Sequence, residues 1–503
     1  MKNRIKQYLL AASMCVGLTA CSDFFEPIPG VQFGLDETFA SKQRTEEYLN
    51  NVYSYVREVT DAIHPNTYGG IFTEASLDGA NRWNKTYAEW TNGSFNSASA
   101  QASEYFSKYY QAIAKASTFI QNVDKCTEAA ASTRGKWKSE ARALRAYYYF
   151  ELLRLYGPIP LIGEDPIPLD ASLEELIKER NSVDECVNFI ATELQSAIDS
   201  GDLLQRAGKA NLGRMDVATC MALKAKLYLY WASPLFNGNT DQASVKNKDG
   251  KQLFPQTEDH SKWTQARDAY ERFMTFATGQ GYKLTEVYTN GKLDPYASCR
   301  AAGEFFTTTW EAVDELIFVK LRDLYDYTYW VCPKFTDFQD TDVTGGGGYY
   351  TTQETVDLFF TKDGLTIEED PGYDKFEGVP GANNFTSGRY YDPNNPSRLY
   401  FDADKSKVLK QWKDREPRFY VNITYSGSIW LNEGKYNEEM RTDFTNGANG
   451  TCGKSKASGD CPDSGYLIRR GAKASNNNGS KHFSPVLRLA DMYLGYAKIG
   501  RAH

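Results

Sequence analysis

Hydrophobic positions recur with helical spacing through the first half of the chain. Between residues 105 and 123 the apolar positions are Tyr105, Tyr109, Ala112, Ala116, Phe119 and Val123, which predicts a helix with one buried face. Residues 136–160 repeat the spacing but carry apolar side chains on more than one side. We therefore expect a helix wedged between neighbours, with "RAYYYF" in the core, that ends at Gly157-Pro158.

Three further stretches read as helices. Residues 182–200 begin with Ser182 followed three residues later by Glu185, the pattern of a capping box. Residues 213–233 and 261–279 follow, and Trp263, Ala266 and Tyr270 resemble positions of a tetratricopeptide repeat. Antiparallel helix pairs of this kind stack into a solenoid.

The pattern changes after about residue 283. Long loops rich in glycine and aromatic residues dominate, with short strand-like stretches at "DELIFVKL" and "RFYVNITYSGSIW" and a last helix at "SPVLRLADMYLGYAKIG". We expect a mostly α protein whose helical scaffold carries a loop-rich, partly β region. Such loops usually carry the binding function.

The composition of the chain narrows the classes of function that it can have. The 503 residues have a formal charge of −8, and no Lys/Arg-rich block follows the first residues, which argues against a nucleic-acid partner. Aromatic residues make up 14% of the chain, with 34 tyrosines and nine tryptophans. These side chains serve both as packing mass and as contact surface.

The N-terminus reads as an export signal. Lys2, Arg4 and Lys6 precede a short apolar run that ends in Leu18-Thr19-Ala20-Cys21, which resembles a bacterial lipobox. In this interpretation residues 1–20 are removed, Cys21 carries the lipid, and residues 21–35 form a tether. The alternative is a secreted protein with a chance cysteine. No later segment is long enough to be a membrane-spanning helix.

Seven cysteines remain beyond Cys21. Cys126, Cys186 and Cys220 lie in helical patterns and are expected to be buried thiols. Cys452 and Cys461 flank the loop "CGKSKASGDC", so a disulfide between them is one of two open alternatives.

Catalytic motifs are missing from the sequence. None of the four histidines belongs to an H-E-x-x-H motif, and no G-x-S-x-G motif occurs. "GANGTCGKS" has the wrong glycine spacing for a phosphate loop, and "FDADKSK" lacks the glycine of a calcium loop. Acidic pairs are plentiful, but most such pairs on loops are solvated. We expect no catalysis, no metal and no cofactor.

Three aromatic segments combine flat rings with hydrogen-bonding side chains, as sugar binding requires. They are "DGANRWNKTYAEW" with Asp78, Asn81, Arg82, Trp83, Asn84 and Trp90; "YDYTYW" with Asp326, Tyr327, Tyr329 and Trp330; and "GGGGYY" with Tyr349 and Tyr350. Trp83 and Trp330 are the first stacking candidates, and Trp430 is a further one. For each segment the alternative is ordinary packing.

Several stretches together resemble the SusD/RagB family of outer-membrane lipoproteins from Bacteroidetes. They are "SEARALRAYYYFELLRLYGPIPLI", "TVDLFFTKDGL", which resembles a strand and turn of that family, "DREPRFYVNI" and "FSPVLRLADMYLGYA". Asp23 and Glu26 after the lipobox also resemble the acidic surface-export tag of such lipoproteins.

The resemblance implies a tetratricopeptide-like scaffold in residues 36–283, a loop-rich region in residues 284–503 and no catalysis. It implies a lid over a TonB-dependent transporter of the SusC type at the cell surface, an oligosaccharide ligand and an outer-membrane location. Members usually continue beyond the last helix, so the chain is interpreted as truncated. A last helix without partners is expected to expose Leu487, Met492, Leu494 or Tyr496.

Two alternatives to glycan capture stay open at this point. One is capture of peptides or proteins, as the RagB branch of the family implies, which would favour an acidic or hydrophobic groove over aromatic plates. The other is a helical-repeat scaffold that binds only protein partners.

Overall fold

The computed structural model describes the chain in twelve stretches. They are residues 34–57, 79–81, 93–163, 171–303, 314–322, 331–335, 345–375, 378–430, 440–445, 451–453, 459–472 and 482–502. Ten residues with a predicted role lie outside these stretches: Cys21, Asp78, Arg82, Trp83, Asn84, Trp90, Asp326, Tyr327, Tyr329 and Trp330.

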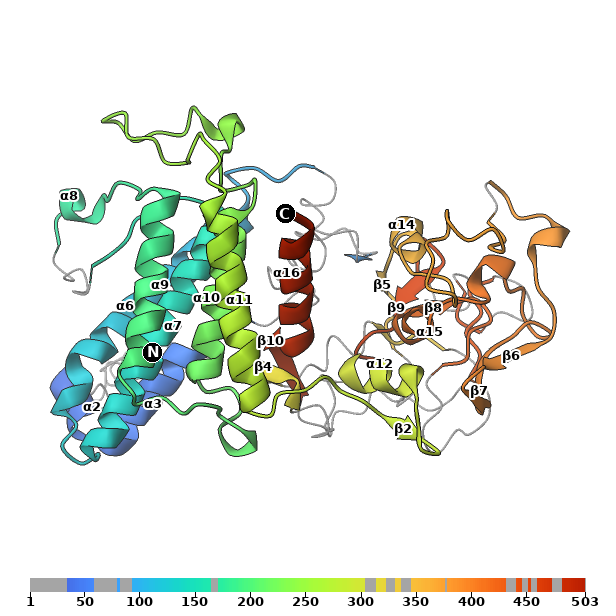
Figure 1. Ribbon diagram of the computed structural model, residues 1–503, viewed down its shortest axis with the longest axis horizontal. Helices are drawn as coiled ribbons and strands as arrows, with labels where there is room; N and C mark the ends of the chain where they lie inside the picture. The colour runs from blue at the N-terminus through green and yellow to red at the C-terminus, as the bar shows by residue number, and fades with distance from the viewer. Residues whose placement is uncertain are drawn as a thin grey trace, which may run out of the picture.

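Helices stand side by side in one part of the molecule (Figure 1). They are α2 (Leu35–Ala40), α3 (Lys42–Ser54), α6 (Ala100–Asn122), α7 (Ala131–Tyr156), α8 (Leu173–Leu176), α9 (Val183–Asp199), α10 (Val217–Ala232), α11 (Ser261–Gly279) and α16 (Leu489–Ala502), with 3-10 turns η1 (Val123–Lys125), η2 (Lys209–Asn211) and η3 (Thr240–Gln242). The helices predicted between residues 105 and 279 are confirmed.

Local sequence fixes where these helices begin and end. Ser182 accepts the backbone N–H of Glu185 at 3.3 Å, and the Glu185 carboxylate accepts the backbone N–H of Ser182 at 2.7 Å, so the predicted capping box of α9 is confirmed. Asp216 caps α10 by accepting the N–H of Thr219 at 2.7 Å. Gly157 ends α7 with a φ of 69°, a backbone angle that glycine adopts without steric cost.

One hydrophobic core runs through the helical part. Helix α7 packs against α6 on one side and α9 on another, and α10 packs against α9 and α11. Residues Tyr147–Phe150 of α7 are all buried, which confirms that "RAYYYF" belongs to the core. A helix that is apolar on several sides needs such neighbours.

Short strands and turns make up the second part. Its strands are β1 (Ala80–Asn81), β2 (Tyr288–Thr289), β3 (Lys292–Leu293), β5 (Tyr349–Tyr350), β6 (Arg389–Asp392), β7 (Asn395–Asp402), β8 (Ile423–Tyr425) and β9 (Tyr466–Ile468). Strands β4 (Leu316–Arg322) and β10 (His482–Arg488) pair with each other beside the helices, and Phe318 and Leu487 belong to the helical core. The helices are α12 (Pro295–Gly303), α14 (Gln353–Asp357) and α15 (Pro417–Asn422), with 3-10 turns η6 (Ala382–Asn384) and η7 (Lys410–Trp412). A four-stranded antiparallel sheet in the order β1-β5-β9-β8 organises this part.

Three stretches differ from the sequence prediction. Residues 484–488 belong to strand β10, which pairs with β4, and the last helix begins only at Leu489. Residues 417–422 form helix α15, because Pro417 is suited to the first turn of a helix. Residues 355–357 lie in helix α14, not in a strand. A distant strand decided the first case, whereas local signals set the other two: Thr352 caps α14 by accepting the N–H of Thr355, and Pro417 begins α15.

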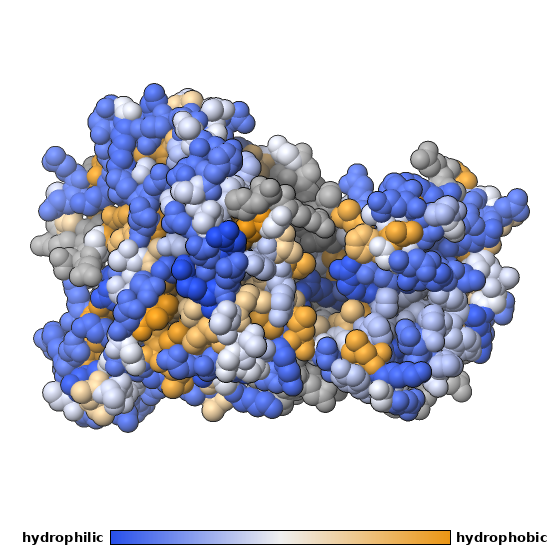
Figure 2. Space-filling view, viewed as in Figure 1, coloured by the Kyte–Doolittle hydropathy of each residue, from blue (hydrophilic) through white to orange (hydrophobic). Residues whose placement is uncertain are grey.

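Strand β10 and helix α16 bring the end of the described chain back to the helical part, where α16 packs against α10 and α11 (Figure 1). Leu487 and Met492 are buried there, so the expectation that they would be exposed is wrong. Leu494 is 70% exposed and Tyr496 36% exposed. Hydrophilic residues cover most of the molecular face in Figure 2, with the larger hydrophobic patches over the helices.

Two further sequence predictions concern the state of the cysteines and the presence of membrane-spanning helices. Cys126, Cys186 and Cys220 are buried thiols, as predicted, and Cys452 and Cys461 are also buried and form no disulfide with each other. Among the helices of the described residues, none combines the length and the apolar character that crossing a bilayer needs.

Candidate functional site

Two of the three aromatic segments meet in the sheet. Asn81 of β1 lies opposite Tyr349 of β5, and Ala80 lies opposite Tyr350, in antiparallel register. Strand β1 is the edge strand of the sheet. The structure therefore brings together the backbone of the first segment, at residue 81, and the Gly-rich third segment, which are more than 260 residues apart in the sequence.

Residues that follow the second segment pair with the same glycine run. The backbone N–H of Gly347 donates to the carbonyl of Cys332 at 2.9 Å, and that of Gly345 donates to Pro333 at 3.0 Å. Cys332 follows Trp330 by two residues. The described residues that flank or begin the three segments, 79–81, 331–335 and 345–350, are thus joined by backbone hydrogen bonds.

The glycine run allows this close approach. Gly347 has a φ of +56°, and a Cβ added there would lie 2.8 Å from the Asp460 carbonyl oxygen and 3.2 Å from the Lys334 nitrogen. Any larger residue would push two segments apart or strain the backbone. A run of glycines beside two tyrosines was the sequence signal for this junction, although sequence alone could not name its partners.

The two tyrosines of the third segment have different environments. Tyr349 is fully buried, and a Cβ at Gly79 would lie 2.6 Å from its hydroxyl oxygen. Its ring packs against the chain that enters β1 and offers no face to a ligand. Tyr350 is half-buried and stays available for contact.

Trp430 is a core residue. Its side chain is 1% exposed, and the guanidinium of Arg469 lies 5.5 Å from the centre of its ring. The interpretation of Trp430 as a stacking residue is therefore wrong. The short segment "YSGSIW" gave no periodicity from which burial could be read.

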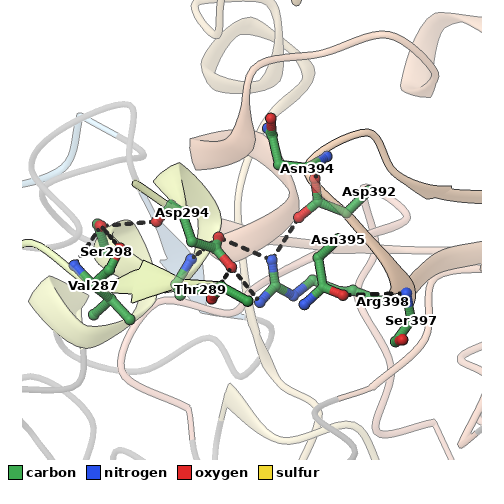
Figure 3. Close-up of polar contacts among 10 residues, drawn as sticks. Val287, Thr289, Asp294, Ser298, Asp392, Asn394, Asn395, Ser397 and Arg398 are labelled. Atoms are coloured by element: carbon green, nitrogen blue, oxygen red, sulfur yellow. Dashed lines mark hydrogen bonds and ion pairs between the residues drawn. The ribbon is translucent and has the colours of Figure 1, made fainter. Parts of the chain in front are cut away.

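A salt bridge fixes the scaffold beside the sheet (Figure 3). Arg398 of β7 donates to both carboxylate oxygens of Asp294 at 3.0 Å and also pairs with Asp392. Asp294 accepts the backbone N–H of Ala297 at 2.9 Å and so caps α12. Burial raises the pKa of Asp294, but the hydrogen bonds from Arg398, Ala297 and Thr289 outweigh it, so the net pKa is lowered. The network joins α12 to the β6–β7 hairpin.

We expect Asp294→Asn to lower the free energy of unfolding by about 1–2 kcal/mol, because the cap can remain while one charged hydrogen-bond pair is lost. The pKa is lowered on folding, so this contribution is present above about pH 4 and is lost as pH falls through the folded pKa. Urea unfolding at pH 7 and pH 3 measures both effects. Asp268→Asn, which removes an exposed partner of Arg267, is the control, and equal losses for the two variants would contradict the expectation.

A second contact joins the helical part to the loops. The ammonium of Lys320 in β4 donates to the carbonyl oxygens of Ser54 at 2.6 Å and Tyr53 at 3.3 Å, at the end of α3. Strand β4 runs directly into the second aromatic segment. The strand before that segment is therefore held against the rigid helices.

Within the twelve described stretches, no group of three or more His, Cys, Asp or Glu side chains could hold a metal ion. The buried thiols of Cys186, Cys220 and Cys332 have pKa values raised by burial, so they are poor nucleophiles.

Comparison with known proteins gives matches along most of the chain. A model described as "SusD family" matches residues 315–497, and one described as "Starch-binding associating with outer membrane" matches residues 32–229. A SusD-like protein of Bacteroides ovatus is 27% identical over 175 residues, which are 33% of this chain and 30% of that protein. The matched stretch thus spans less than a third of that relative.

Solved structures share the fold. The structure designated BT4246 matches with a TM-score of 0.73 and 24% sequence identity. The aligned region covers 92% of this chain and 79% of that chain. A SusD-like carbohydrate-binding protein from Bacteroides fragilis has a TM-score of 0.61 and 17% identity, with 92% and 74% of the two chains covered. At these identities the likeness concerns the fold.

Proposed function

Because the chain belongs to the SusD/RagB family, we propose that it captures an oligosaccharide at the cell surface and delivers it to a TonB-dependent transporter of the SusC type. The observation that supports the proposal is that residues 80–81, at the start of the first aromatic segment, and residues 332–333, just after the second, are joined by backbone hydrogen bonds to the third, residues 345–350. The carbohydrate-binding relative from Bacteroides fragilis and the starch-binding family description support the same ligand class.

Chain geometry favours a shared site. Trp83 follows Asn81 by two residues and Trp330 precedes Cys332 by two, and two residues of extended chain reach at most about 7 Å. A tryptophan face can cover the C–H face of a sugar ring. The hydroxyl groups of the sugar then need directional partners, which Asn84, Arg82 and Asp326 can supply.

Binding without catalysis is the mechanism that these residues support. The proposed ligand is uncharged and few of the proposed contact residues are charged, so affinity should be modest and should depend only weakly on salt. Delivery to a transporter requires such reversible binding, because a tightly held ligand would not be released.

Membrane attachment rests on Cys21 in this proposal. The lipobox at Leu18–Cys21 would place acyl chains at the start of a Pro/Gly-rich tether. Each buried methylene of an acyl chain contributes about 0.8 kcal/mol, so several chains hold a protein at a membrane.

We expect Cys21→Ala to release the protein from the outer membrane, because the variant lacks the thiol that carries the lipid. Fractionation of cells without the partner transporter measures this directly. Cys299→Ala, at a half-buried cysteine within the fold, is the control and should stay in the membrane fraction. A Cys21→Ala protein that still sediments with the outer membrane would contradict the anchor.

The ligand class is tested by calorimetry against a panel of neutral oligosaccharides, with product analysis of the same mixtures. We expect saturable binding of at least one oligosaccharide and no new reducing ends. Release of smaller sugars would identify a hydrolase instead. Binding of peptides but of no oligosaccharide in the panel would contradict glycan capture.

A further inference from the structure

A concave pocket lies in the loop-rich part, and none of its lining residues belongs to the three aromatic segments. Three turns enclose a pocket of about 330 Å³, a volume at the lower end of the range for small-ligand sites. The turns are the one after α14, the one around Tyr373, and residues 410–414 together with Thr386. All the residues that line it belong to the described part of the chain.

Side chains of both charges line this pocket. Lys362, Lys410 and Lys413 supply ammonium groups, and Asp363, Asp370, Asp374 and Asp414 supply carboxylates. Lys362 pairs with Asp363 at 2.6 Å and Lys410 with Asp374 at 3.2 Å. These pairs neutralise each other, so the pocket has donors and acceptors without a strong net charge.

One donor and one acceptor at the floor of the pocket have hydrogen-bonding capacity that the described residues do not use. Asp414 accepts the hydroxyl of Tyr390 at its Oδ1 atom at 2.9 Å, and its Oδ2 atom has no hydrogen bond to any described residue. The Lys413 ammonium lies 5.5 Å from the centre of the Tyr390 ring and makes no ion pair with a carboxylate of the described chain. A ligand can therefore reach an ammonium and a carboxylate on consecutive residues.

The surrounding structure holds the pocket open. The backbone N–H of Lys362 donates to the carbonyl of Asp414 at 2.8 Å. Beneath the pocket the buried guanidinium of Arg415 donates to the Tyr373 hydroxyl at 2.9 Å and to the Phe359 carbonyl at 2.6 Å. Tyr373 in turn donates to the Gln411 carbonyl at 3.2 Å. The walls are thus fixed without a ligand, which lowers the entropic cost of binding.

From this geometry we propose that the pocket around Lys413 and Asp414 is a second binding site, for a neutral sugar residue. A sugar hydroxyl both donates and accepts, so adjacent ammonium and carboxylate groups can pair with neighbouring hydroxyls of one ring. Anionic ligands would meet four carboxylates, and cationic ligands would meet three ammonium groups. A metal ion fits less well, because no three of the described carboxylates are placed so that they could hold one together.

The test uses the full chain and methyl glycosides of glucose, galactose and xylose as probes, followed by saturation-transfer NMR. We expect at least one of them to bind saturably, and glucuronate and glucosamine to bind more weakly. Lys413→Met and Asp414→Asn should each weaken that binding about tenfold, the loss of one charge-assisted hydrogen bond. Asparagine tolerates the left-handed backbone that Asp414 adopts at a φ of 55°, so the fold should persist.

Lys405→Met, which removes an exposed lysine outside the pocket, is the control and should bind as wild type does. The proposal does not rest on the three aromatic segments, so the pocket variants and Lys405→Met are compared in a chain that also carries Trp83→Ala and Trp330→Ala, in which sugar binding at those tryptophans cannot contribute. If none of the three glycosides binds, or if Lys413→Met and Asp414→Asn bind them as wild type does, the site is refuted. If only Trp83→Ala and Trp330→Ala lose oligosaccharide binding, that loss supports glycan capture by the aromatic segments. It does not change the conclusion drawn from the methyl glycosides.

Discussion

Replacing Glu193 by glutamine should lower the free energy of unfolding by about 3–5 kcal/mol, the cost of leaving a buried charge without its partner. Arg145 of α7 is completely buried, and its Nε donates to the Glu193 carboxylate at 3.0 Å. Glutamine keeps the shape of glutamate but not its charge. A loss of this size is a large share of the ~5–15 kcal/mol typical of a domain.

Two further variants separate charge from packing. Arg145→Met combined with Glu193→Leu removes both charges, and it should be more stable than Glu193→Gln because no buried charge is left uncompensated. Asp124→Asn breaks an exposed pair with Lys138 and should cost at most about 1 kcal/mol. Urea unfolding followed by circular dichroism measures all three. Glu193→Gln with the stability of Asp124→Asn would contradict a buried pair that supports the helices.

Replacing Arg415 by methionine should cost at least about 3 kcal/mol, because several buried acceptors lose their donor and each unsatisfied group costs about 1–3 kcal/mol. Arg415 is 2% exposed and donates to the carbonyl oxygens of Val356 at 2.8 Å and Phe359 at 2.6 Å. It also donates to Tyr373, so one guanidinium closes the end of α14 and the floor of the polar pocket.

Arg415→Lys should recover only part of this stability, since a single ammonium cannot reach three separated acceptors with fixed geometry. Arg418→Met is the matched control. Its side chain is 53% exposed and pairs with Glu416, so its loss should cost at most about 1 kcal/mol. Thermal and urea unfolding measure the stability of the three variants. Equal stability of Arg415→Met and Arg418→Met would contradict the role given to Arg415.

Local periodicity predicted the helices but not their contacts with the strands. The pattern from Tyr105 to Val123 and the Ser182 capping box depend on residues within one helix, so sequence alone identified α6 and α9. Residues 484–488 read as helix but form a strand, because β4 lies more than 160 residues earlier in the chain and supplies the pairing. No local pattern contains that information.

For the candidate site, too, the sequence predicted some features and could not predict others. Its residue types could be chosen from sequence, because sugar binding needs flat rings beside amide and carboxylate groups. The sequence could not predict which ring faces solvent, because Tyr349 and Tyr350 are adjacent and lie in the same stretch of sequence. The pairing of β5 between β1 and β9 buries the first and leaves the second half-exposed.

Calorimetry with tryptophan variants tests the central claim, that the aromatic junction captures a glycan. The oligosaccharide that binds wild type should be titrated into Trp83→Ala, Trp330→Ala and the control Tyr288→Ala, which removes a tyrosine that is 60% exposed on the β2–β3 turn. We predict that each tryptophan variant loses about 1–2 kcal/mol of binding free energy, on the scale of an interface hot spot, and that Tyr288→Ala binds as wild type does. Equal affinity of wild type and both tryptophan variants would contradict the claim.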